Sequence, residues 1–166
     1  YANFKLRNEI LDIKKFLDSV NHFLRKSSIS ILEIKRKKNN FNARFDAKKR
    51  IYEYVIVNRQ GSLKIDKNRA WHVKKKIDID LLKKGGKTFE GKHDFSTFRS
   101  TSCSAQSPIK KMDLVKIKKK GDKIFIIFKS RSFLQNQVRS MVGCLIYLAT
   151  CKWNMNNFKK SFQSKK

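Results

Sequence analysis

Residues 113–129 read Asp-Leu-Val-Lys-Ile-Lys-Lys-Lys-Gly-Asp-Lys-Ile-Phe-Ile-Ile-Phe-Lys, and no other segment says as much about the architecture. Residues 113–120 and 123–129 predict two strands, because Gly121-Asp122 between them suits the two-residue turn of a β-hairpin. A helix is expected from Ser132 to Thr150. Its apolar residues recur at helical spacing: Val138, Met141, Val142, Leu145, Leu148 and Ala149. Hairpin strands and helices in mixed order predict an α+β domain.

The preceding part of the chain predicts a further strand over residues 48–57. Alternation would place Ile51, Val55 and Val57 on one face and the side chains of Tyr52, Tyr54 and Ile56 on the other. A short helix is expected over residues 77–84, with Gly85-Gly86 at its C-terminal cap. A last helix is expected from Asn154.

The first forty residues predict less regular structure. An amphipathic helix is expected over residues 9–26, with Asn8 as its cap. A short strand is expected over residues 29–34. Residues 35–40, Lys-Arg-Lys-Lys-Asn-Asn, form a basic break and a candidate linker.

Composition narrows the class of protein. At 166 residues the chain is one domain, or one domain with part of another. No apolar run reaches the length of a transmembrane helix, and the first 30 residues carry charges throughout. The three Cys form no Cys-x-x-Cys pair and the three His lack metal-ligand spacing, which argues against zinc and for reduced thiols inside a cell.

The net charge of +28 favours a polyanionic partner, either a nucleic acid or an anionic membrane. Glu9, Asp12 and Asp18 interrupt the first helix and count against the membrane. Lys far outnumbers Arg, which is also typical of an AT-rich codon bias. The few Arg are therefore more informative, because their planar forks make specific RNA contacts.

Two Arg lie in settings that call for an explanation. Arg44 stands between Phe41 and Phe45, and cations beside aromatic rings are suited to gripping RNA. Arg139 interrupts an apolar run, so it either reaches out to water or meets a carboxylate. Tyr52 has two interpretations as well: a platform for a nucleotide base, or an ordinary residue of a half-buried strand.

Four blocks, in this order, resemble the tRNA pseudouridine synthase A family: Phe41 to Phe45, Arg50 to Tyr54, His93 to Arg99 continuing to Cys103 and Pro108, and Phe133 to Gly143. The resemblance implies a pseudouridine synthase fold, with a mixed or antiparallel sheet flanked by helices and two ferredoxin-like subdomains. Residues 1–40 would be the remnant of the first subdomain and residues 41–166 an incomplete second one. It also implies a cytoplasmic homodimer that isomerises uridine in the anticodon stem-loop of tRNA, without a cofactor, a metal or a membrane.

The resemblance assigns roles residue by residue. Tyr52 would pack against the target base, and Arg139 would form an ion pair with the catalytic aspartate. Two segments would contact tRNA: Phe41, Asn42, Ala43, Arg44 and Phe45, and Ser102, Cys103, Ser104, Ala105 and Gln106. Asp94 matches a structural position, and Phe95 and Phe98 are expected in the core.

The sequence departs from the family pattern at both of its ends. The family continues past the helix expected from Asn154 to a final strand, which is expected to be missing here. The family's nucleophilic aspartate lies in an Arg-Thr-Asp loop, and no Arg-Thr-Asp occurs in these 166 residues. That loop is expected upstream of Tyr1, and the chain by itself is expected to be inactive. The alternative is a non-catalytic basic RNA-binding module.

Overall fold

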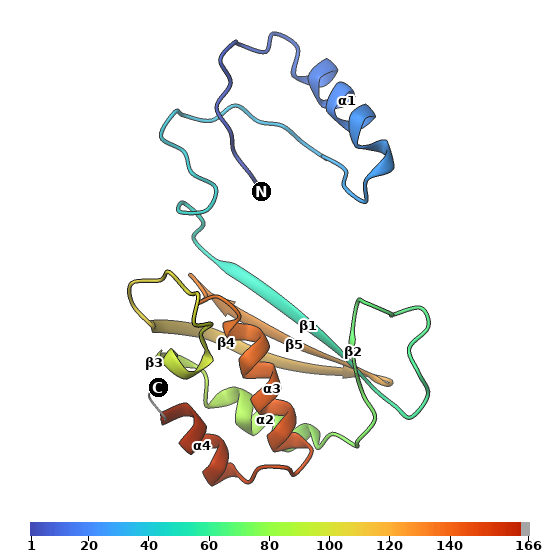
Figure 1. Cartoon of the computed structure of the whole chain (residues 1–166), viewed down its shortest axis with the longest axis vertical. Helices are drawn as coiled ribbons and strands as arrows, with labels where there is room; N and C mark the ends of the chain where they lie inside the picture. Colours follow the sequence, from blue (N-terminus) through green and yellow to red (C-terminus); the bar gives the residue numbers. More distant parts are fainter. Residues whose placement is uncertain (164–166) are drawn as a thin grey trace. The chain divides into compact units, whose positions relative to one another are not determined.

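The computed structural model describes residues 1–163. The chain divides into two compact units between Ala47 and Lys48. We call residues 1–47 the N-terminal unit and the remainder the sheet unit, and both are drawn in Figure 1. Residues 41–47, which the resemblance assigns to the second subdomain, therefore belong to the N-terminal unit.

The N-terminal unit contains one helix, α1 (Ile13–Phe23), followed by a single 3-10 turn over Leu24–Lys26. The helix begins later than the sequence predicts, and Asn8 as its cap is wrong. Asp12 is the cap, because its extended backbone lets its carboxylate accept the N–H of Lys15 at 2.9 Å. No residue of α1 is fully buried.

The strand predicted over residues 29–34 is also wrong. The backbone of Ile31 pairs with a side chain: its N–H donates to Asn21 Oδ1 at 2.8 Å, and its carbonyl accepts from Asn21 Nδ2 at 2.9 Å. The amide of Asn21 thus supplies the donor and the acceptor that a neighbouring strand would supply. The segment follows α1 as an extended chain and joins no sheet.

The sheet unit is built on a mixed five-stranded sheet in the order β2-β1-β5-β4-β3. The strands are β1 (Arg50–Asn58), β2 (Trp71–Val73), β3 (Gly91–Asp94), β4 (Ile109–Lys120) and β5 (Lys123–Ser130). Only β1 and β2 run parallel. The predicted β4–β5 hairpin is confirmed, and its turn residue Gly121 has a φ of +59°, the left-handed region that glycine adopts without strain.

Three helices cover one face of this sheet: α2 (Ile79–Lys87), α3 (Gln137–Ala149) and α4 (Met155–Gln163). The core lies between the layers, where Phe128, Leu145 and Phe158 are buried in one cluster. Phe95 and Phe98 belong to the same cluster, so their predicted core role is confirmed. No helix among residues 1–163 is long and apolar enough to cross a membrane.

Gly85 and Gly86 do not end α2, as the sequence predicts, but lie inside it and are buried. A Cβ on Gly85 would lie 2.6 Å from Leu148 Cδ2 in α3, and one on Gly86 would lie 2.8 Å from Ile117 Cδ1 in β4. The two glycines are needed for this close approach of α2 to its neighbours. The helix ends at Lys87, with Thr88 as its C-terminal cap.

Candidate functional site

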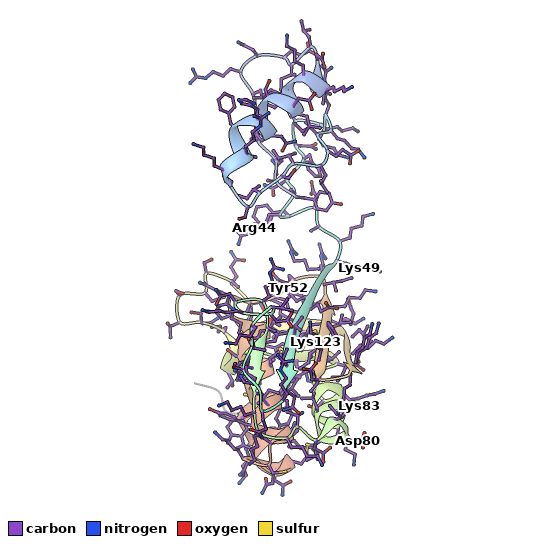
Figure 2. The ribbon with its side chains drawn as sticks, turned by 90° about the vertical axis from the view of Figure 1, so that its right-hand side faces the viewer. Arg44, Lys49, Tyr52, Asp80, Lys83 and Lys123 are labelled. Carbon is purple, nitrogen blue, oxygen red and sulfur yellow. The ribbon has the colours of Figure 1, made fainter. Side chains whose placement is uncertain are left out.

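Tyr52 lies near the start of β1, on the face that the helices cover (Figure 2). Farther along the same face Tyr54 is half-buried and Ile56 is fully buried, while Tyr52 remains 49% exposed. Its ring meets the ring of Phe133 edge to face, with centroids 5.0 Å apart and an interplanar angle of 79°. Tyr52 is therefore an aromatic ring at the border of the core, held on one side and open to solvent on another.

The segment that carries Phe133 joins β5 to α3 and is fixed by several hydrogen bonds. Arg50 Nη1 donates to the carbonyl of Arg131 at 2.5 Å. The buried Gln137 accepts the N–H of Leu134 on its Oε1 at 2.8 Å. Asn136, with a φ of +60°, makes the bend from which α3 starts. This segment is consequently a well-defined wall beside Tyr52.

The predicted tRNA-contacting loop, residues 102–106, is tied to the same segment. The N–H of Ser100 donates to the carbonyl of Gln135 at 3.0 Å. The backbone N–H of Gln135 stabilises the thiolate of Cys103 most strongly, and that of Ala105 adds to this effect. Together they lower the pKa of this thiol below its ordinary value. The structure thus brings the loop and the neighbourhood of Tyr52 together through residues 133–136.

Arg139 lies in the first turn of α3, and its side chain is exposed although Val138 and Met141 beside it are buried. Among residues 1–163 it forms no ion pair. The guanidinium is therefore accessible to an acidic group from outside these residues. Its predicted pairing with a catalytic aspartate stays a prediction.

The segment Phe41–Phe45 is an ordered turn of the N-terminal unit. Asn42 Oδ1 accepts the N–H groups of Arg44 at 2.9 Å and of Phe45 at 3.1 Å. The Arg44 guanidinium lies 5.8 Å from the centre of the Phe45 ring, at cation–π distance. Phe45 is 75% exposed. An exposed ring with a cation above it is a chemically suitable surface for a nucleotide.

Asp94 serves the local fold, in keeping with its predicted structural position. Its Oδ1 accepts the backbone N–H of Ser96 at 2.9 Å and the hydroxyl of Ser96 at 2.6 Å. This arrangement shapes the turn that leads into the buried Phe98.

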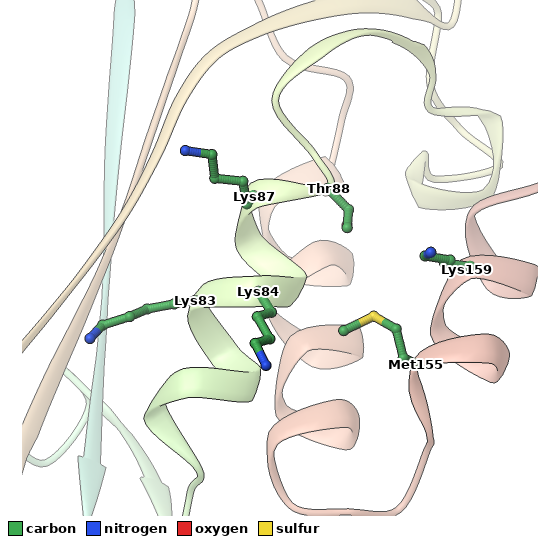
Figure 3. A pocket seen from close by; sticks show the side chains of 6 residues that line it. All are labelled: Lys83, Lys84, Lys87, Thr88, Met155 and Lys159. Atoms are coloured by element: carbon green, nitrogen blue, oxygen red, sulfur yellow. The ribbon is translucent and has the colours of Figure 1, made fainter.

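An open hollow of about 500 Å³ lies elsewhere, between α2 and α4 (Figure 3). Its lining residues come from α2 and the cap of this helix, and from α4: Lys83, Lys84, Lys87, Thr88, Met155 and Lys159. None of its lining residues is a predicted site residue. The candidate site is therefore the surface around Tyr52.

Sequence reasoning included Phe133 in a motif but did not assign it a role, and it gave no role to Gln135. Phe133 comes 81 residues after Tyr52 along the chain, so no local pattern could pair the two rings. The only signal in the sequence was the position of Phe133 at the head of its block.

Comparison with known proteins places these features in one family. Residues 86–166 match the sequence profile of the tRNA pseudouridine synthase family. The chain is 52% identical, over 99% of its length, to the tRNA pseudouridine synthase A of Pelagibacter ubique, of which it covers 67%. It is 34% identical over 93% of its length to that of Maricaulis maris and 40% identical over 89% to that of Parvibaculum lavamentivorans, and it covers 62% and 60% of these relatives. The chain thus spans about three fifths to two thirds of the relatives' length, and it belongs to the tRNA pseudouridine synthase family.

Proposed function

We propose that this chain is part of an enzyme that isomerises uridine to pseudouridine in the anticodon stem-loop of tRNA. The observation that carries the proposal is that one segment, residues 133–136 directly before α3, contacts Tyr52 through Phe133 and the start of the 102–106 loop through Gln135. The proposal includes a homodimer that acts in the cytoplasm, as the resemblance implies. Among the residues 1–163, no group of three or more His, Cys, Asp or Glu side chains could hold a metal ion.

The reaction is an exchange of one bond for another within the nucleotide. The bond from uracil N1 to the ribose breaks, the base turns, and C5 bonds to the same ribose carbon. The C5 hydrogen leaves as a proton to the solvent, and N1 takes up a proton in its place. A carboxylate acts as the nucleophile. The resemblance gives that role to an aspartate that is not among these residues.

The residues of this chain would support the reaction by position and charge. Tyr52 would stack on the extruded uracil and offset part of the cost of unstacking it, with stacking worth about 1–3 kcal/mol. Arg139 would keep the aspartate ionised and oriented. The polar loop 102–106 would bind the tRNA backbone through hydrogen bonds.

The test is tritium release from tRNA labelled at C5 of uridine, with the complete protein that includes the residues upstream of Tyr1. We expect Tyr52→Ala and Arg139→Ala to lower turnover at least about tenfold, the effect of losing about 1.4 kcal/mol of transition-state stabilisation. Tyr147→Ala and Arg69→Ala are matched controls, because both alter exposed residues elsewhere in the sheet unit. Normal turnover in both site variants would remove the site assignment. RNA binding without turnover in the complete protein would favour the non-catalytic RNA-binding module.

A further inference from the structure

We propose that Phe133 is a positioning residue, whose ring fixes the plane of the Tyr52 phenol for stacking on the target base. This inference rests on the proposed function, because it assigns Tyr52 to the base. It concerns a residue that would not itself touch the RNA.

The side chain of Tyr52 is less restrained than its backbone. The strand fixes the backbone of Tyr52 through its register with Phe128, but a side chain that is 49% exposed has few neighbours to select its rotamer. A stacking platform that changes its plane would present its face to the base only part of the time. A fixed wall is therefore needed, and Phe133 is the ring in contact.

The rings of Tyr52 and Phe133 meet in an edge-to-face contact. Edge-to-face packing places the positive rim of one ring against the negative face of the other. The centroid separation of 5.0 Å and the angle of 79° match this arrangement. Aromatic pairs favour edge-to-face and offset-stacked arrangements over a face-to-face sandwich, so the contact restricts the plane of the Tyr52 ring.

Phe133 is itself held in place by its surroundings. It is half-buried and packs against the core cluster. The hydrogen bond from the Leu134 N–H to the buried Gln137 holds the turn directly after it. Arg139 lies in the first turn of α3, directly after this segment. The connection from β5 to α3 therefore positions both the ring of Phe133 and the backbone of Arg139.

A spectroscopic experiment tests the contact without relying on activity. Incorporation of 3-fluorotyrosine gives a fluorine resonance for Tyr52, which Tyr52→Phe assigns. In Phe133→Leu we expect this resonance to lose the ring-current shift of the neighbouring ring, whereas Phe125→Leu leaves it in place. Phe125 is a half-buried Phe of β5 on the opposite face of the sheet. A resonance that Phe133→Leu does not move would overturn the inference.

A kinetic experiment tests the role in the complete protein. We expect Phe133→Leu to lower kcat about two- to tenfold, the range expected for one aromatic pair, with little change in KM. Phe133→Tyr keeps an aromatic ring at this position, so we expect its kcat to equal that of the unsubstituted protein. Phe125→Leu should also leave kcat unchanged. Where the Leu variant does not fold, Phe133→Met fills a similar volume.

The outcomes separate this inference from the proposed function. Loss of activity in Tyr52→Ala together with normal kcat in Phe133→Leu overturns the positioning role and leaves the proposed function standing. A rise in KM alone in Phe133→Leu also overturns it, because the ring would then serve only binding. Full activity in Tyr52→Ala removes both.

Discussion

The cysteines of the sheet unit differ in their surroundings, and the difference bears on the candidate site. Backbone N–H groups, that of Gln135 foremost, lower the pKa of the Cys103 thiol. Burial raises the pKa of the Cys144 thiol, and a hydrogen bond with Ser161 opposes this in part. Because the thiolate is the reactive form, Cys103 should react with electrophiles at lower pH than Cys144.

Alkylation with iodoacetamide, followed at each cysteine by mass spectrometry, checks this order. As the pH falls, the rate at Cys144 should decline first, because the thiolate of a group with a raised pKa disappears first. The rate at Cys103 should persist to lower pH. An anticodon stem-loop RNA should slow the modification of Cys103 and not that of Cys144. The reverse order of reactivity would contradict the hydrogen bonding described for this loop.

For individual residues, the sequence predicted the face of a strand or helix on which a side chain lies better than it predicted which side chains contact one another. It placed Tyr52 and Tyr54 on one face of a strand, and the structure confirms that face. It could not pair Tyr52 with Phe133 or Cys103 with Gln135, because these contacts form only when distant segments meet. The role of Arg139 stays a prediction, since its expected partner is not among the described residues.

At the scale of helices, alanine substitutions at Gly85 and Gly143 are expected to change the free energy of unfolding in opposite directions. A Cβ on Gly85 would lie 2.6 Å from Leu148 Cδ2 and 2.9 Å from Leu145 Cδ2, and both leucines are buried. A Cβ on Gly143 in α3 would meet nothing within 4 Å. Gly85→Ala should destabilise the protein by about 1–2 kcal/mol, because overpacking outweighs the gain in helix propensity. Gly143→Ala should stabilise it by up to about 1 kcal/mol.

Urea unfolding of the two variants, monitored by circular dichroism, measures these changes. A more stable Gly85→Ala would mean that α2 and α3 pack less closely than described. A less stable Gly143→Ala would mean that another group occupies the space beside α3.

Long, strongly patterned elements were predicted well, and short ones were not. The hairpin β4–β5 and helix α3 were expected, because their apolar patterns extend over many residues. Strands β2 and β3 were missed, because three or four residues show no period and pair only through their neighbours. The segment over residues 29–34 has the pattern of a strand, but the side chain of Asn21 takes its hydrogen bonds.

In the molecule as a whole, apolar surface is concentrated in the N-terminal unit. Helix α1 has an apolar stripe but no fully buried residue. Leu11 and Leu32 are 91% and 90% exposed, and Phe23 is 84% exposed. Exposed large apolar side chains in this number are typical of a surface that contacts other protein segments. The relatives are longer than this chain, so they have additional residues that could provide such a cover.

The 166 residues on their own are expected to lack isomerase activity. They contain no Arg-Thr-Asp, and Arg139 has no acidic partner among the described residues. The resemblance places the nucleophile outside these residues, and without a nucleophile the glycosidic bond stays intact however well the base is held. We therefore expect no tritium release and only weak RNA binding. Fusion to the segments of the Pelagibacter ubique relative that this chain does not cover should restore turnover.

The matched control is the same fusion with the aspartate of its Arg-Thr-Asp loop, which the resemblance places in the added segment, changed to Asn. This variant should restore RNA binding but not turnover, because only the carboxylate of the nucleophile has been removed. Arg139→Ala in the active fusion should lower kcat, since the guanidinium would no longer orient the carboxylate. Measurable turnover by the 166 residues alone would show that a carboxylate within them acts as the nucleophile, and it would end the role assigned to Arg139.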